Sequence, residues 1–215
     1  MKKYLIISCM VIAGLSILLI IRYLETSKTE TVNQDEEVTY QTAPIEEQTL
    51  VYIGDEDADN ELLFVFDYSC PWCKVWLEEV YPELEDEYIQ EGTLKFRTQA
   101  MVYLNEASLL LSNFDQNLKN HLPDQYEALF NQVVADVDFE QEKQTDWGTT
   151  SYIETLIDDY QLDRELLLQE PEIDAISVTR KYTRELEIDG VPTVFVNGVR
   201  IDDLFDIDAI TAEIK

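Results

Sequence analysis

The feature of this sequence that most restricts its fold is a cysteine pair placed where one pattern of residues gives way to another. The stretch "ELLFVFDY" is apolar at consecutive positions from Leu62 to Phe66, which is typical of a strand buried on both faces. The stretch "CPWCKVW" follows at once, and Pro71 suits the first turn of a helix because an N–H has no helical partner there. The pattern predicts that Cys70 lies between strand and helix, with Cys73 one turn into the helix.

Three uses of this cysteine pair have to be compared. A structural zinc site needs about four N or S ligands, and beyond the apolar N-terminal run the chain offers only Cys70, Cys73 and His121. A structural disulfide between residues three apart closes a very small loop, and small loops give the least stabilisation. A cysteine at a helix N-terminus faces unpaired N–H groups and the positive end of the helix dipole, which favour the thiolate. Redox chemistry is therefore the predicted use.

The N-terminus carries an uncharged apolar run, "YLIISCMVIAGLSILLII", which two lysines precede and Arg22 follows. A helix of about 18–20 residues can just cross a hydrocarbon core of about 30 Å. No A-x-A-like cleavage site follows the run, so we expect residues 1–24 to be an uncleaved signal anchor, a single transmembrane helix, with Cys9 as a buried thiol. The positive charges predict that the rest of the chain lies outside the cell membrane.

The remainder of the chain is strongly acidic. The whole sequence has 15 Lys and Arg against 45 Asp and Glu, and three of the basic residues lie in the first 24. Beyond the anchor, 12 basic and 45 acidic residues therefore give a formal charge of −33. Such a surface repels nucleic acid and anionic lipid, so both are poor partners. Residues 25–48 are polar and show no apolar period, so they are predicted to form a disordered acidic tether.

Residues 49–215 are predicted to form one α/β domain. The stretches "TLVYI", "ELLFVFDY" and "TLKFRTQAMVYL" have the composition of strands, and the helix that begins at the cysteine pair separates the last two. Residues 105–184 show a helical pattern. In "DGVPTVFVNGVRI" two short strands flank Asn197–Gly198, the signal of a two-residue hairpin, and "DIDAITAEIK" closes the chain as a helix.

The stretches "DYSCPWC" and "GVPTVFVNG", in this order, resemble the thioredoxin-like disulfide oxidoreductases of the DsbA family, in particular the membrane-anchored Gram-positive type. The resemblance covers roughly residues 50–215. It implies a thioredoxin fold with an inserted helical subdomain at about residues 105–184. It also implies an extracytoplasmic enzyme that introduces disulfides into unfolded exported proteins, needs no cofactor beyond its own redox-active disulfide, and is reoxidised by a quinone-linked membrane partner.

The resemblance also implies a role for each motif residue. Cys70 would be the attacking thiolate and Cys73 the buried resolving thiol. Pro192 would be a cis proline packed against the disulfide, and an ordinary trans turn is the alternative. Val191 would offer backbone groups to an extended substrate peptide, and Thr193 completes the G-V-P-T motif.

Two residues beside the cysteines allow two interpretations each. Asp67 is either a proton acceptor or helix-start partner near the sulfurs, or a solvated carboxylate at a strand end. In the first case its charge would raise the thiol pKa. Trp72 either presents a flat apolar surface to unfolded chains or covers the disulfide.

The dipeptide Pro71–Trp72 lacks the histidine that helps to hold the thiolate in some family members. The direction of electron flow is therefore open, with a reductase or isomerase as the alternative to an oxidase. A surface-anchored binding or chaperone protein that has kept the scaffold without the catalysis is the alternative of another class.

A possible calcium loop lies earlier in the chain. In "GDEDADNE" three aspartates, Asp55, Asp57 and Asp59, alternate as in such a loop, but its sixth and twelfth positions hold Asn60 and Phe66 instead of Gly and Glu. A solvated turn is expected. A looser structural calcium site made of scattered carboxylates is the alternative, and no other metal site is predicted.

Overall fold

The computed structural model describes residues 42–140 and 146–215. The predicted anchor of residues 1–24, with Cys9, and most of the predicted tether lie outside the described residues. Within the described part of the chain, no helix has both the length and the apolar character needed to cross a membrane.

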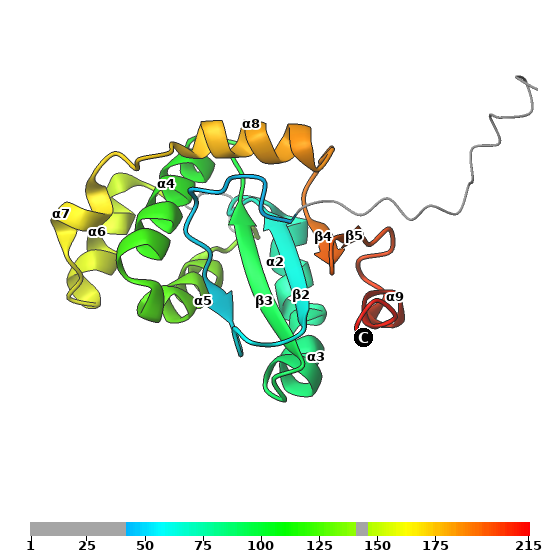
Figure 1. Ribbon diagram of the computed structural model, residues 1–215. Coiled ribbons are helices and arrows are strands. Elements are labelled where there is room, and N and C mark those ends of the chain that lie inside the picture. Colours follow the sequence, from blue (N-terminus) through cyan, green and yellow to red (C-terminus); the bar gives the residue numbers. More distant parts are fainter. Residues whose placement is uncertain (1–41, 141–145) are drawn as a thin grey trace, which may run out of the picture. The chain divides into compact units, whose positions relative to one another are not determined.

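A mixed five-stranded sheet forms the centre of the domain (Figure 1). Its strand order is β1-β3-β2-β4-β5, and only β2 and β3 run parallel to each other. The central strand β2 is buried almost throughout, as its continuous apolar pattern predicts. The strands are β1 (Tyr52–Ile53), β2 (Asn60–Phe66), β3 (Leu94–Ala100), β4 (Thr193–Val196) and β5 (Val199–Arg200).

The helix after β2 is divided, as expected from Pro82. The first part, α2 (Pro71–Glu79), ends before Val80, and α3 (Tyr81–Leu84) begins with Pro82 in its first turn. A π-helical turn, η1 (Glu85–Ile89), continues α3. Gly92 then reverses the chain with φ +72°, a conformation that favours glycine, and β3 follows.

The described residues between β3 and β4 form five helices, where the sequence predicts helical structure. The first, α4, starts with a reciprocal capping box between Asn105 and Ser108. The set is α4 (Glu106–His121), α5 (Tyr126–Asp136), α6 (Thr150–Asp159), α7 (Arg164–Leu168) and α8 (Ala175–Glu185), with the 3₁₀ turn η2 (Pro123–Gln125) before α5. The last helix of the chain, α9 (Ile207–Thr211), follows β5.

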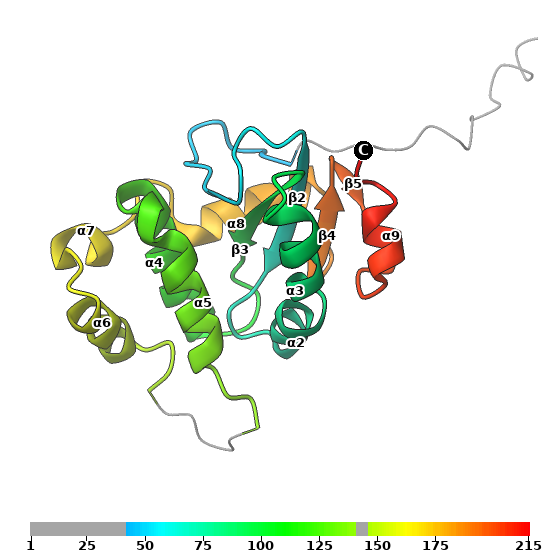
Figure 2. The ribbon, with the colours of Figure 1, turned by 90° about the horizontal axis from the view of Figure 1, so that it is seen from below.

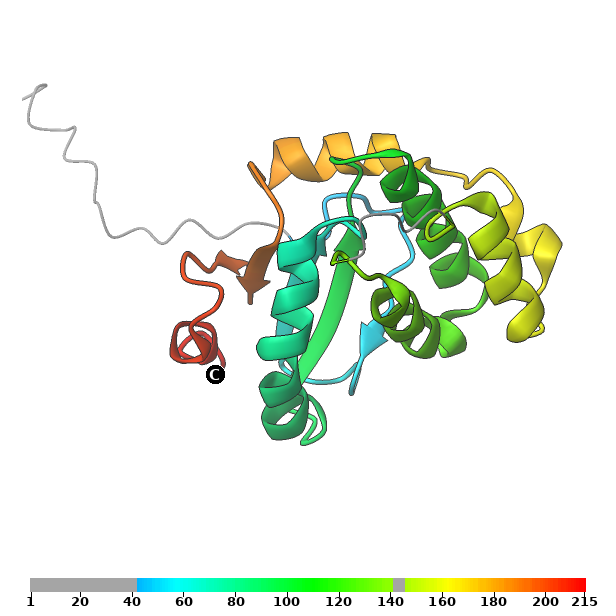
Figure 3. The same cartoon turned by 180° about the vertical axis from the view of Figure 1, so that it is seen from behind.

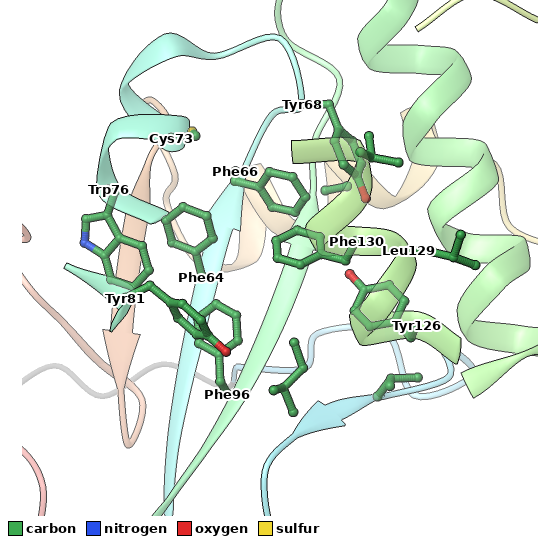
Figure 4. Close-up of a cluster of buried hydrophobic side chains, with 14 of the residues drawn as sticks. Phe64, Phe66, Tyr68, Cys73, Trp76, Tyr81, Phe96, Tyr126, Leu129 and Phe130 are labelled. Carbon is green, nitrogen blue, oxygen red and sulfur yellow. The ribbon is translucent and has the colours of Figure 1, made fainter. Parts of the chain in front are cut away.

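The two faces of the sheet are covered differently (Figure 2). Helix α8 packs against one face, where Val178, Tyr182 and Leu186 join apolar side chains of β2 and β4. The other face carries the larger core, to which α2, α3, α4, α5 and α6 all contribute, and Figure 3 shows α2 and α3 in front of the strands from this side. Stacked and edge-on aromatic rings fill that core (Figure 4), with Phe64 and Trp76 4.4 Å apart at their ring centres. Cys73 belongs to the same core, so the fold places one of the two sulfurs in apolar surroundings.

The end of the predicted tether differs from the prediction. Residues 42–48 contact the domain. Arg97 on β3 is buried, and this segment supplies one of the oxygen atoms that accept its hydrogen bonds. Arg97 donates to the carbonyl oxygen of Thr42 and, at 3.1 Å, to Glu61 Oε1. Gln48 bonds to Gln99 at 2.7 Å. A buried cation therefore attaches the segment before β1 to the sheet.

Candidate active site

The two cysteines lie where β2 passes into α2, as the sequence predicts. Beyond the strand, the N–H of Cys70 donates to the carbonyl oxygen of Asp67 at 2.9 Å and closes a turn. Cys70 occupies the N-cap position of α2 with extended backbone angles, φ −91° and ψ 115°, and Pro71 is in the first turn. No side chain caps this helix, so the N–H groups of its first turn are available to the Cys70 sulfur.

Cys70 is a buried free thiol with an acidic character. A hydrogen bond from the Cys73 thiol, together with the backbone N–H groups of Cys73 and Trp72, lowers the pKa of Cys70 to about 7. Burial and the charge of Asp67 act in the opposite direction on this pKa. A pKa this low makes the thiolate, the form that reacts with disulfides, available near neutral pH.

Cys73 has the opposite properties. It is 2% exposed, and burial raises its pKa far above the usual range, with the adjacent Cys70 adding to the effect. Figure 4 shows Cys73 on the same helix as Trp76, next to the aromatic rings of β2. One helix turn thus carries a reactive sulfur at its start and an inert, protonated sulfur inside the core.

The loop before β4 meets the sulfurs from the other side. The Val191–Pro192 peptide bond is cis, which agrees with what the family resemblance implies. The Cys70 sulfur lies 3.6 Å from the carbonyl oxygen of Val191 and donates to it. Thr193 is buried, and its hydroxyl donates to the carbonyl oxygen of Gly190 at 2.8 Å, which holds this loop. The structure therefore brings the two sequence motifs together, although about 120 residues separate them.

Asp67 is not the solvated strand-end carboxylate that was one of its two interpretations. It is fully buried, and four hydrogen-bond donors satisfy its two oxygens. It accepts from the N–H of Ser69 at 2.8 Å and from the Ser108 hydroxyl at 2.6 Å. The N–H groups of Tyr103 and Leu104 donate to its other oxygen at 2.9 and 3.3 Å. Asp67 thus joins the turn before Cys70 to the loop that leads into α4.

Trp72 is 64% exposed, so most of the residue lies open to solvent. It contacts Phe205, with ring centres 6.2 Å apart in an edge-on arrangement. The loop that carries Phe205 is held in place by Trp76, whose Nε1–H donates to the carbonyl oxygen of Leu204 at 2.7 Å. The sequence analysis did not identify Phe205, because no local pattern relates it to the cysteines.

A second group of buried polar side chains lies behind the cysteine turn, and the sequence analysis missed it. Asp115 Oδ1 accepts from the hydroxyls of Tyr68 at 2.9 Å and Tyr126 at 2.8 Å. Asp115 Oδ2 lies 2.8 Å from Lys119 Nζ, one helix turn further along α4, and all four side chains are buried. A signal was present, since Asp115 falls on the same helical face as the apolar Leu111.

The predicted turn at Asp55 has the features of an exposed turn, with the N–H of Asp57 donating to Asp55 Oδ1 at 3.0 Å. His121 is exposed at the end of α4, and its Nε2 lies 2.7 Å from Gln169 Nε2. In residues 42–140 and 146–215, no group of three or more His, Cys, Asp or Glu side chains is arranged to hold a metal ion.

Comparison with known proteins places this geometry in context. A protein-family model described as Thioredoxin matches residues 46–215. The chain is similar to disulfide bond formation protein D of Bacillus subtilis (strain 168), with 26% identity over 179 residues that cover 76% of this chain and 74% of that protein. It is also similar to the probable disulfide bond formation protein D of Bacillus anthracis, with 24% identity over 173 residues that cover 76% and 77% of the two chains.

Solved structures with a similar fold include oxidised BdbD from Bacillus subtilis, with a TM-score of 0.64 and 18% identity over 83% of this chain and 95% of that one. A periplasmic thioredoxin-like protein from Salmonella enterica serovar Typhimurium gives a TM-score of 0.62 and 17% identity, over 80% and 92% of the chains. Wolbachia pipientis alpha-DsbA1 gives 0.60 and 16%, over 80% and 90%. These likenesses show the thioredoxin fold.

Proposed function

This chain belongs to the thioredoxin family and is a thiol–disulfide oxidoreductase, and we propose that it introduces disulfide bonds into exported proteins through Cys70 and Cys73. The observation that carries the proposal is the difference between the two thiols. Cys70 has its pKa lowered to about 7 at a helix N-terminus, whereas burial keeps Cys73 protonated. The lowered pKa makes Cys70 the sulfur that enters and leaves the mixed disulfide. The direction, oxidation of the substrate, is supported by the relatives named disulfide bond formation protein D.

The proposed reaction starts from the disulfide between Cys70 and Cys73. A substrate thiolate attacks the Cys70 sulfur and forms a mixed disulfide, and Cys73 leaves and takes up a proton. The second substrate thiolate attacks the substrate sulfur of the mixed disulfide and releases Cys70 as a thiolate. Release is favoured because a thiol of lower pKa is a better leaving group. The substrate loses two electrons to the enzyme, whose disulfide becomes two thiols.

The surroundings of the sulfurs have complementary roles in this proposal. The carbonyl oxygen of Val191, 3.6 Å from the Cys70 sulfur, marks where the backbone of an extended substrate peptide would pair. Pro192 and Thr193 hold this loop against the cysteines, and Pro71 starts the helix. Trp72 presents an apolar surface to the substrate. Asp67 fixes the turn before Cys70.

We further propose that the enzyme acts outside the cytoplasm, held by an N-terminal membrane anchor, and that a quinone-linked membrane protein reoxidises it. The uncharged run of residues 4–21 supports the anchor. Disulfides persist in oxidising compartments outside the cytoplasm, and one structural relative is described as periplasmic. No cofactor is required beyond the cysteine pair.

The redox potential tests the direction of the reaction. The full-length chain carrying Cys9→Ala should be equilibrated with glutathione buffers, and its thiol content measured by alkylation. We expect a potential between about −120 and −200 mV, as for oxidising members of the thioredoxin class. A potential near about −270 mV, as for thioredoxin, would show that the protein is a reductase and not an oxidase. The Asp67 charge acts in that direction, because it raises the pKa of Cys70 and so destabilises the thiolate of the reduced form.

Variants of the two cysteines test the roles. We expect Cys70→Ser to abolish oxidation of a reduced two-cysteine peptide. Cys73→Ser should also fail to oxidise the reduced peptide, because the disulfide between Cys70 and Cys73 cannot form. Mixed instead with a disulfide-containing peptide, its Cys70 thiolate should form a mixed disulfide that Cys73 can no longer resolve. If Cys70→Ser restored the phenotype of a deletion strain in full, a binding or chaperone role without catalysis would be the correct function.

A further inference from the structure

Trp72, two residues after Cys70, and Phe205 form an exposed aromatic pair beside the cysteine turn. Eight large apolar side chains are exposed among the described residues, and four of them are tied to immediate neighbours of Cys70. Trp72 and Phe205 contact each other. Tyr103 and Leu104 are tied to Asp67, three residues before Cys70, through their N–H groups. An exposed apolar pair beside a reactive thiol is suited to an unfolded polypeptide, which presents apolar side chains.

The loop that carries Phe205 is well anchored. We call residues 201–206 the Phe205 loop. Its first N–H, that of Ile201, donates to the carbonyl oxygen of Val194 at 2.9 Å. Trp76, packed in the core, donates to the carbonyl oxygen of Leu204 at 2.7 Å. Phe205 is therefore held beside Trp72 by the bonds at Ile201 and Leu204, and not by its own burial, since it is 41% exposed.

The charges on the Phe205 loop are all negative. Asp202, Asp203 and Asp206 are exposed beside Phe205, and Asp208 follows in the first turn of α9. Asp206 caps α9, whereas neither Asp202 nor Asp203 takes part in a salt bridge with any described residue. Arg200, directly before the loop, pairs with Asp189 at 2.6 Å, and Lys74, two residues after Trp72, pairs with Glu78 at 3.6 Å.

We propose that the Phe205 loop selects substrate segments with an apolar side chain and basic residues beside the reacting cysteine. Phe205 and Trp72 would contact the apolar side chain, and the carboxylates of Asp202 and Asp203 would attract the basic residues. This inference rests on the proposed function. Charges of one sign that border an apolar surface raise the local concentration and the association rate of a ligand of the opposite sign.

The test uses three reduced peptides, each with two cysteines and a phenylalanine next to the first. They differ in two flanking residues, which are Lys in one peptide, Gln in the second and Glu in the third. The oxidised full-length enzyme with Cys9→Ala is mixed with each peptide at about 10 mM ionic strength, and reduction of the enzyme is followed by tryptophan fluorescence. Each rate is divided by the rate of the same peptide with hydroxyethyl disulfide, because flanking charges also change the thiol pKa.

We expect the Lys peptide to react about 10-fold faster than the Glu peptide, with the Gln peptide between them, and the ratio to fall at about 0.5 M salt. The double variant Asp202→Asn/Asp203→Asn should reduce the ratio about 3-fold or more. The matched control, Glu83→Gln/Glu87→Gln, removes the same charge from α3 and η1, which Figure 1 places at the end of the sheet where β2 begins. This control should leave the ratio within about 1.5-fold.

Phe205→Ser should slow all three peptides by a similar factor, and Phe205→Leu should restore most of the rate. Equal rates for the Lys and Glu peptides would overturn the inference. An equal loss of preference in both double variants would also overturn it, because the overall charge would then be the cause. If the neutral Gln peptide were not oxidised at all, the proposed function itself would fail, and the inference with it.

Discussion

Two buried carboxylates hold α4 to the residues between β2 and α2, and they are satisfied in different ways. Asp67, next to the sulfurs, accepts from four neutral donors, three backbone N–H groups and one serine hydroxyl. Asp115, deeper in the domain, accepts from two tyrosine hydroxyls and is paired with the ammonium of Lys119 at 2.8 Å. The adjacent residues Asp67 and Tyr68 therefore lead to two separate polar centres.

The difference separates an electrostatic role from a structural one. Asp67 has no cation at hydrogen-bond distance among the described residues, so its charge is felt at the sulfurs and raises the pKa of Cys70. The negative charge of Asp115 is balanced by the adjacent ammonium group of Lys119. Burial lowers the pKa of Lys119, and the Asp115 charge opposes that change. In the active site, the uncompensated charge of Asp67 changes the pKa of Cys70. Between the inserted helices and the sheet, Asp115 and Lys119 form an ion pair with no net charge.

The largest effect is expected from breaking the Asp115–Lys119 pair. Lys119→Met removes the cation, leaves a buried carboxylate without its partner and deprives the Thr98 carbonyl oxygen of its 2.9 Å donor. We expect the free energy of unfolding to fall by about 3–5 kcal/mol, measured by urea denaturation.

The control for that variant is Lys181→Met on α8, which breaks a pair with Glu185 at the same i,i+4 spacing on the surface. An exposed pair of this kind contributes about 0.3–0.5 kcal/mol. Equal losses in the two variants would show that the buried pair has no special role.

A smaller loss is expected from Asp67→Asn, together with a change in chemistry. The amide has one acceptor oxygen in place of two, so one or two buried donors lose their partner at a cost of about 2 kcal/mol. Removal of the charge should also bring the pKa of Cys70 below about 7, measured by the pH dependence of alkylation with iodoacetamide.

The comparison variant, Asp115→Asn, should destabilise the protein while leaving the pKa of Cys70 unchanged. The distinction between the two carboxylates would be wrong if both variants moved the thiol pKa alike.

Tyr126→Phe tests the contribution of hydrogen bonds around Asp115 without breaking its ion pair with Lys119. It removes one 2.8 Å donor to the carboxylate and the partner of the Thr98 hydroxyl, without changing any charge. We expect a loss of about 1.5 kcal/mol in thermal or urea unfolding and no change in peptide oxidation. Tyr160→Phe, whose hydroxyl bonds to Gln132 on the surface, should stay within about 0.5 kcal/mol, and a similar loss there would contradict the reading.

The smallest effect concerns pH. The pKa of Cys70 is about 7 in the folded dithiol form and about 9 in the unfolded chain. The folded form therefore loses its proton first, so stability rises as the pH increases from about 7 to about 9 and is lost as the pH falls through about 7. We expect about 1 kcal/mol between pH 6.5 and pH 7.8 for the reduced protein relative to its Cys70→Ser variant. Parallel stability curves for the two proteins would contradict the lowered pKa.

Local sequence was enough to predict the parts of the fold in which neighbours along the chain act on one another. The apolar run of β2, Pro71 at the start of α2 and the hairpin at Asn197–Gly198 all appear where their patterns indicate. The helical stretch between β3 and β4 was equally readable, because its apolar period is a property of adjacent turns. The bounds were less accurate, and β1 is only Tyr52–Ile53, since pairing with β3 decides how far it extends.

By itself, the sequence determined where the cysteines stand: at a strand end, before a helix whose N–H groups face them. Only the tertiary structure decided how each side chain is partnered. Asp67 and Tyr103 are 36 residues apart, and Trp76 and Leu204 are 128 apart, so no local pattern relates them. Burial and hydrogen bonding depend on every segment that packs around a group. The raised pKa of Cys73 and the position of Phe205 therefore follow from packing between distant parts of the chain, whereas the lowered pKa of Cys70 comes from hydrogen bonds within its own helix turn.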